Sequence, residues 1–120
     1  MYSSTIAKMN IPDMPPMPQW QEPGEYLGNA RAGQVHVVSP HPYWRLHSQM
    51  NNSERLRKRY TVQTREPLTI SVEDAKAHGI QDGDLVELYN NRGAVVVGAR
   101  VSDKIMPGVV SLYEGAWPQL

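Results

Sequence analysis

The clearest hydrophobic pattern lies in the second two-thirds of the chain, where short apolar runs alternate with turn residues. These runs, rich in Val, Ile and Leu, predict strands at 34–39, 68–70, 85–89, 94–101 and 108–113. The Asn-Asn-Arg-Gly stretch at 90–93 predicts a tight hairpin turn, because Asn and Gly tolerate positive φ. Short strands of this kind, separated by turns, are typical of a small barrel.

Helical signals are few and local. Ser71 can cap a helix over 72–78 with Asp74 three residues along, and Gly79 stands where a helix-ending glycine belongs. The stretch 43–50 is expected to coil into a short helix, and a brief helix is expected around 53–59. The fold class predicted from these patterns is mainly β, a barrel with one or two short helices.

The first 33 residues differ from the rest of the chain. Five of the ten prolines fall there, spaced too closely for a helix or a paired strand. The apolar residues between them are large, whereas a free linker would carry Gly and Ser. We therefore expect 1–33 to be an extended Pro- and Met-rich strap from a preceding domain, followed by a folded unit at 34–120. The side chains available for docking are Met9, Ile11, Met14, Met17 and Trp20.

Composition argues against several classes of protein. Twelve basic and twelve acidic residues among 120 give zero net charge, which disfavours a dedicated nucleic-acid or membrane-surface binder. The absence of cysteine excludes disulfides, thiolate metal sites and cysteine nucleophiles. No apolar run approaches the ~20 residues that a membrane span needs.

The order of the predicted elements resembles a known module. The predicted order is strand, helix, Asp-Gly-Asp turn, strand, hairpin and two further strands. This order resembles the C-terminal cofactor-binding domain of the molybdopterin oxidoreductases, a double-psi β-barrel. The string SPHPYWRLHSQMNN at 39–52 is similar to that of the dimethyl sulfoxide, trimethylamine N-oxide and biotin sulfoxide reductase branch. Residues 25–30, 106–110 and 114–117 are similar to the same branch.

The resemblance implies a function for a larger protein. Enzymes of this family are molybdenum oxidoreductases that bind molybdenum bis(molybdopterin guanine dinucleotide) and reduce an S-oxide or N-oxide. They are several times longer than this chain, their serine ligand to molybdenum lies in an earlier domain, and their domain continues beyond the equivalent of residue 120. The implied identity is thus a truncated cofactor-binding barrel, inactive alone, whose partners are the remaining domains of the same reductase. The alternative is a non-catalytic double-psi barrel used as an interaction module.

The cofactor implied by this resemblance needs cations and N–H donors for its phosphates, and mixed donors and acceptors for its pterin edge. The stretch 41–49, directly after the first predicted strand, supplies these donors and acceptors within nine residues. Prolines on both sides of its first histidine hold the backbone rigid. Arg45 could instead pair with a local carboxylate, and His36 and His78 are expected to be structural. The candidate cofactor-binding residues are His41, Arg45, His47, Ser48 and Gln49.

Two other interpretations of the polar residues are disfavoured. His41 and His47 are six residues apart, unlike the i, i+4 pair of a helical zinc site, and no carboxylate lies near them in sequence. No metal site is therefore expected. The basic run at 55–59 contains no aromatic residue, so a solvated arm is expected there rather than a nucleic-acid site.

Overall fold

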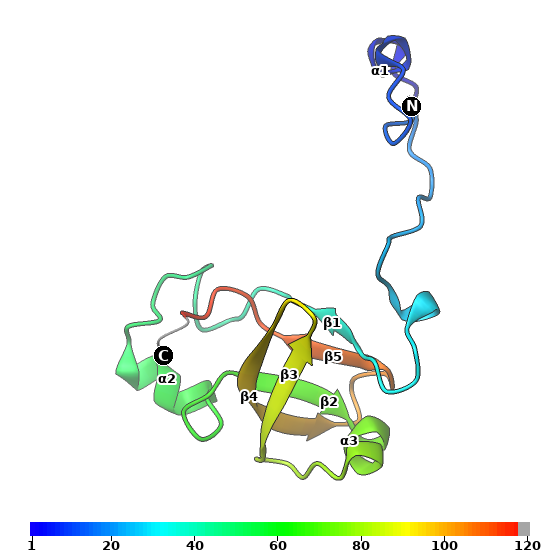
Figure 1. The fold of residues 1–120 in the computed structure, drawn as a ribbon. Coiled ribbons are helices and arrows are strands. Elements are labelled where there is room, and N and C mark those ends of the chain that lie inside the picture. Colours follow the sequence, from blue (N-terminus) through cyan, green and yellow to red (C-terminus); the bar gives the residue numbers. More distant parts are fainter. Residues whose placement is uncertain (118–120) are drawn as a thin grey trace.

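The computed structural model describes residues 1–117, and its strands form one curled sheet that resembles half of a barrel (Figure 1). The last three residues of the predicted 34–120 unit lie outside the described residues. All five predicted strands are present, so the expected mainly β, barrel-like fold is confirmed. They are β1 (His36–Val38), β2 (Pro67–Ser71), β3 (Leu85–Asn90), β4 (Gly93–Ser102) and β5 (Val109–Leu112).

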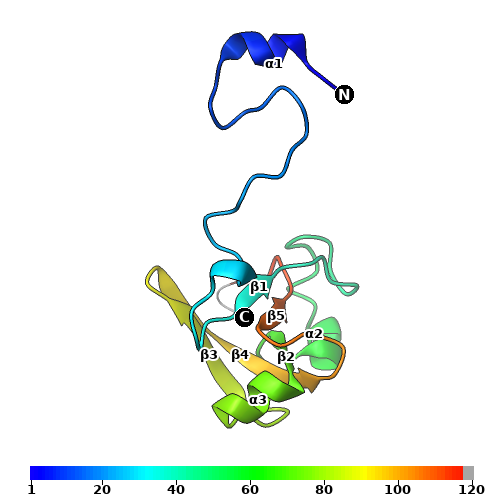
Figure 2. The ribbon, with the colours of Figure 1, turned by 90° about the vertical axis from the view of Figure 1, so that its right-hand side faces the viewer.

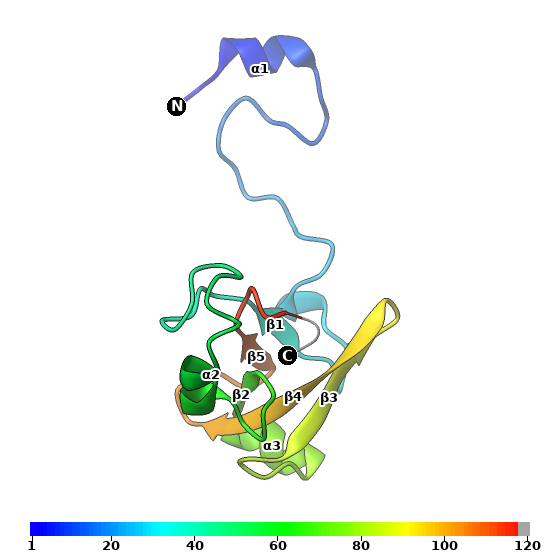
Figure 3. The ribbon, with the colours of Figure 1, turned by 90° about the vertical axis from the view of Figure 1, so that its left-hand side faces the viewer.

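The sheet is mixed, with the strand order β1-β5-β2-β4-β3. The pairs β1–β5 and β2–β4 are parallel, whereas β2–β5 and β3–β4 are antiparallel. The predicted hairpin joins β3 to β4, and Asn90 Oδ1 accepts hydrogen bonds from the backbone N–H groups of Arg92 and Gly93. Figure 3 shows this hairpin extending along one side of the molecule.

The core lies between the sheet and α3 (Val72–His78). Ser71 Oγ accepts a hydrogen bond from Asp74 N at 2.9 Å, and the helix ends at Gly79, whose φ is 67°, as predicted. Asp74 Oδ2 also accepts from the N–H of Gly108 at 2.8 Å, which fastens the helix to the turn before β5. The buried cluster comprises Leu68, Ile70, Ala75, Val97 and Val110.

One expectation for the segment between β1 and β2 is wrong. Residues 43–50 form successive turns rather than a helix, because His47 and Met50 adopt positive φ values of 49° and 69° that interrupt a helical repeat. The expected helix near 53–59 is present as α2 (Glu54–Tyr60), and no residue of its basic run at 55–59 is buried. Tyr60, one residue beyond the expected range, is buried and anchors the end of α2.

The N-terminal segment leads away from the sheet (Figure 2). The radius of gyration is 18.3 Å, against about 13.6 Å for a compact chain of this length. The expected strap is not extended along its whole length. It contains α1 (Ser4–Met9) and a 3₁₀ turn, η1 (Leu27–Asn29). In the described part of the chain, no helix has the length and apolarity that crossing a bilayer requires.

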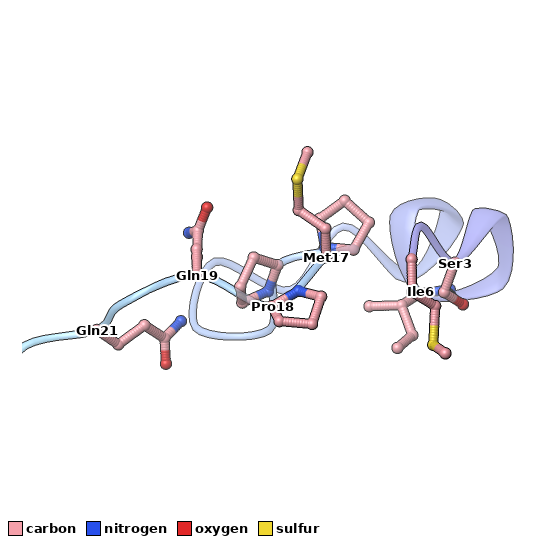
Figure 4. A pocket seen from close by; sticks show the side chains of 9 residues that line it. Ser3, Ile6, Met17, Pro18, Gln19 and Gln21 are labelled. Carbon is pink, nitrogen blue, oxygen red and sulfur yellow. Dashed lines mark hydrogen bonds between the residues drawn. The ribbon is translucent and has the colours of Figure 1, made fainter.

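The helix α1 exists because its ends are capped before the prolines begin. Ser3 Oγ accepts a hydrogen bond from Ile6 N at 3.3 Å, and Asn10 ends the helix in the left-handed region. The chain then turns back, so that Ser3 N donates to Pro16 O at 2.7 Å, and an open pocket of about 360 Å³ lies between the two segments (Figure 4). The large apolar side chains of this segment remain available, with Trp20 78% exposed.

Candidate functional site

The candidate residues lie on a loop that runs beside the segment following β5. This loop, residues 39–52, and the segment 113–117 are far apart in sequence, yet Glu114 N donates to Pro40 O at 3.2 Å. Gly115 has a φ of 81°, and a side chain there would collide with the backbone of His47 and Ser48. The glycine is therefore required both for its backbone conformation and for this close approach. We call the surface formed by 39–52 and 113–117 the loop–tail surface.

Arg45 joins the two halves of the loop–tail surface from within. Its side chain is 1% exposed, and its Nη1 lies 2.8 Å from Glu66 Oε1. Its Nε and Nη2 donate to the Glu114 carbonyl at 2.9 and 2.6 Å. A buried cation is tolerated because acceptors surround it. Of the two roles considered for Arg45, pairing with a carboxylate is the one that the structure shows, and the guanidinium is withdrawn from the surface.

A second set of contacts holds the backbone of Ser48. The Ser48 carbonyl accepts hydrogen bonds from Asn51 Nδ2 at 3.0 Å and from Trp117 Nε1 at 2.8 Å. Asn51 is buried and also donates to the Gly115 carbonyl. These contacts hold His47 in its left-handed conformation, which costs roughly 1–2 kcal/mol for a residue other than glycine. The side chains of His47, Ser48 and Gln49 all remain exposed.

The two candidate histidines meet at one carboxylate. His41 Nδ1 lies 2.6 Å from Glu114 Oε1, and His47 Nδ1 lies 3.0 Å from the same oxygen. The imidazole rings lie edge to face, with centroids 5.0 Å apart. A carboxylate only accepts hydrogen bonds, so each Nδ1 carries the proton and donates it. Each ring then keeps Nε2 for another partner, and the two side chains are 67% and 69% exposed.

Glu114 changes one premise of the sequence argument. The lack of a nearby carboxylate counted against a metal site, but the fold supplies one from 67 positions along the chain. One ligand atom from each of His41, His47 and Glu114 lies within 4.8 Å of the others. Proximity in sequence could not reveal this, because the contact depends on the approach of the 113–117 segment to the loop.

An aromatic groove of about 560 Å³ opens beside the same loop. Trp44 stacks on Tyr60 with centroids 4.5 Å apart and meets Tyr113 edge to face at 4.8 Å. Arg59 and Arg100 add two cations to the lining. Aromatic faces beside guanidinium groups suit a planar ring that carries negative charge. This groove was not predicted, because its lining comes from five separate parts of the chain.

The environment of the groove alters one phenol. Burial raises the pKa of Tyr60 above its ordinary value, and the negative charge of Glu66 acts in the same direction. Trp44 Nε1 is also buried there, and among the described residues it has no hydrogen-bond partner. The groove is thus lined by a neutral phenol, whereas the unpaired Trp44 N–H is buried.

Comparison with known sequences finds relatives over nearly the whole chain. A profile of the Molydopterin dinucleotide binding domain family matches residues 35–119. The dimethyl sulfoxide/trimethylamine N-oxide reductase of Cereibacter sphaeroides is 49% identical over 118 residues, and the trimethylamine-N-oxide reductase of Haemophilus influenzae is 46% identical over 118. Trimethylamine-N-oxide reductase 1 of Escherichia coli K12 is 47% identical over 120 residues. The matches cover 98% of this chain but only 14% of each relative.

Among solved structures, acetylene hydratase from Pelobacter acetylenicus has a similar fold. The TM-score is 0.79, and the match covers 97% of this chain and 16% of that chain. The sequence identity is 16%, so this likeness concerns the fold alone.

Proposed function

The chain belongs to the Molydopterin dinucleotide binding domain family, and we propose that it binds part of a molybdenum bis(molybdopterin guanine dinucleotide) cofactor through the loop–tail surface. The observation that carries the proposal is the pair of exposed imidazoles, His41 and His47, oriented by one carboxylate on a braced loop. A finer part of the proposal is that the curled sheet belongs to a double-psi β-barrel. The mixed strand order and the fold of acetylene hydratase support a barrel of this general kind.

The donor set on the loop–tail surface fits this cofactor. A pterin edge presents both N–H and C=O groups, and the pyrophosphates present anionic oxygens. The exposed imidazoles, the Ser48 hydroxyl and the Gln49 amide offer donors and acceptors together. When bound, the cofactor supplies the two-electron chemistry of molybdenum, whereas the side chains of this chain bind and orient it.

Arg45 has a different role in this proposal from the one expected. Its guanidinium braces the Glu114 carbonyl from inside the fold, so it acts as a positioning residue for the Glu114 side chain and the histidines. Glu114 in turn holds both rings with Nδ1 inward and leaves Nε2 for the ligand. Residues Asn51 and Gly115 hold the backbone on which these side chains stand. The ligand therefore meets a surface that is already organised, which lowers the entropic cost of binding.

We further propose that the domain works within a larger reductase of S-oxides or N-oxides, and that its partners are the remaining domains of that protein. The names of the relatives support this, since they are dimethyl sulfoxide and trimethylamine N-oxide reductases. The chain spans 14% of their length, and we assign no molybdenum ligand within it. The isolated chain is therefore expected to have no reductase activity. A role as an interaction module alone is disfavoured by the family match.

A titration of the isotopically labelled 120-residue chain with guanosine diphosphate tests the binding site. This probe carries the guanine and diphosphate of the cofactor, and we expect weak binding because it buries little surface. Backbone shifts should concentrate at 41–49 and leave the 90–93 hairpin still. Added salt should weaken binding, because the contacts to phosphate are exposed.

Substitutions make the test specific. His41→Ala and His47→Ala should each weaken binding of guanosine diphosphate, whereas His78→Ala, at the exposed end of α3, should leave it unchanged. Shifts centred on Tyr60 and Arg100 would move the site to the aromatic groove and contradict the proposal. Undiminished binding in both loop variants would contradict it as well.

A further inference from the structure

We propose that His41, His47 and Glu114 form a site for one zinc-class transition-metal ion. The three side chains offer two imidazole nitrogens and one carboxylate oxygen. This donor set suits Zn²⁺ and its neighbours, whereas Mg²⁺ and Ca²⁺ prefer oxygen ligands throughout. Three protein ligands leave the fourth position of a tetrahedral ion open. The inference goes beyond the proposed function, because it requires neither the dinucleotide nor a reductase.

The three ligand atoms lie within 4.8 Å of one another, and the two nitrogen–oxygen separations are shorter than those of a tetrahedral site. Bonds of roughly 2.0–2.1 Å hold the ligand atoms of such an ion about 3.4 Å apart. The two nitrogens now lie 2.6 and 3.0 Å from the Glu114 oxygen. The rings must therefore move outward by roughly 0.8 and 0.4 Å to admit the ion. Both side chains are about two-thirds exposed, so these small movements meet little packing resistance.

The backbone around the site is already held in place. Arg45 fixes the Glu114 carbonyl, and the Pro40 carbonyl accepts the Glu114 N–H. On the other side, the close approach of Gly115 to His47 sets the separation of the two segments. An ion therefore orders only side chains and not a loop, which is the condition under which three ligands give useful affinity.

Binding of the ion has a defined consequence for the protons of the imidazoles. In the metal-free chain each Nδ1 donates to Glu114, so a neutral ring carries its proton on Nδ1. The ion takes the Nδ1 lone pair, and the proton of each ring moves to Nε2 through exchange with water. No net proton is released by a neutral ring. The outward-facing Nε2 atoms change from acceptors to donors, so the same surface then favours anionic oxygen.

Zinc chloride added to the full 120-residue chain tests the proposal, with magnesium chloride as the control ion. Calorimetry should show one zinc ion per chain and no heat from magnesium. The ring ¹⁵N spectrum should show His41 and His47 passing to the Nε2-protonated form. The rings of His36 and His78 should keep their signals, because neither contributes to the cluster.

Variants separate this site from nonspecific binding. Glu114→Gln, which keeps the backbone carbonyl that Arg45 requires, should weaken zinc binding by more than about tenfold. His41→Ala and His47→Ala should each do the same, and His78→Ala should change nothing. Circular dichroism verifies that each variant is folded, as expected for the exposed histidines and for an isosteric change at the half-buried Glu114.

Two results would overturn the inference. One is the absence of zinc binding up to millimolar concentration. The other is unchanged zinc affinity in the double variant His41→Ala/His47→Ala. Either result would leave the proposed function standing if guanosine diphosphate still binds at 41–49. Conversely, zinc binding without nucleotide binding would contradict the proposed function alone.

Discussion

Replacing Arg45 with Met removes the buried cation that braces the loop–tail surface. The change leaves the Glu66 carboxylate, whose side chain is only 13% exposed, without its partner at 2.8 Å. It also removes the donors that reach the carbonyls of Tyr113 and Glu114. Loss of one member of a buried ion pair typically costs about 3–5 kcal/mol, because the other charge stays buried and unpaired. We expect a loss of that size in the free energy of unfolding.

This loss is a large share of the domain's total free energy of unfolding. A domain of this size has roughly 5–15 kcal/mol of stability, so the Arg45→Met variant should remain folded with a much lower midpoint in urea. Arg45→Lys keeps the charge but lacks the planar fork that reaches Glu66 and Glu114 together, so its loss should be intermediate. The double variant Arg45→Met/Glu66→Leu removes the stranded carboxylate and should recover part of the loss.

Urea unfolding followed by circular dichroism measures these differences, and an unchanged slope verifies that the folded states are comparable. Arg55→Met, at an exposed position on α2, is the matched control and should change stability by less than about 0.5 kcal/mol. The reasoning is refuted if Arg45→Met costs no more than the ~1 kcal/mol of an exposed pair. It is also refuted if the double variant is less stable than Arg45→Met alone.

Two further predictions concern pH and the N-terminal segment. Because burial and then the charge of Glu66 raise the pKa of Tyr60, its contribution to stability is present below its ordinary pKa of 10.0 and is lost as pH rises through the higher folded value. Urea unfolding over a pH series should show this fall, and Tyr60→Phe should reduce it. Hydrogen exchange should be much faster at residues 1–20 than at Val110, which is buried in the core. Equal protection would show that the N-terminal segment packs stably on the sheet.

Local chemistry explains which parts of the fold could be predicted. The cap at Ser71 and the glycine at 79 act within one turn, and the 90–93 hairpin depends on residues that tolerate positive φ. These signals are complete within a few residues, so the sequence alone predicts them. The capping of α1 by Ser3 is a signal of the same kind, but the prolines that follow it favoured an extended segment.

Features that depend on distant contacts could not be predicted. The basic stretch around α2 appears polar by composition, yet Tyr60 anchors it by stacking on a tryptophan sixteen positions earlier in the chain. The turns at 43–50 replace a helix because Asn51 and Gly115, which both lie outside 43–50, hold the backbone there. In both cases the partner residue carries no local signal of its role.

The candidate site likewise combines residues that are close in sequence with residues that only the fold brings together. Its ligand-facing side chains lie together in a short string, so His41, His47, Ser48 and Gln49 could be proposed from sequence, and their binding role stays a prediction. The side chains that orient them come from the 113–117 segment, and their meeting depends on Arg45, which never reaches the surface. Arg45 is therefore the residue through which stability and binding are connected. A substitution there should disturb the histidines without touching the ligand, whereas a substitution at either histidine should disturb the ligand and leave the fold intact.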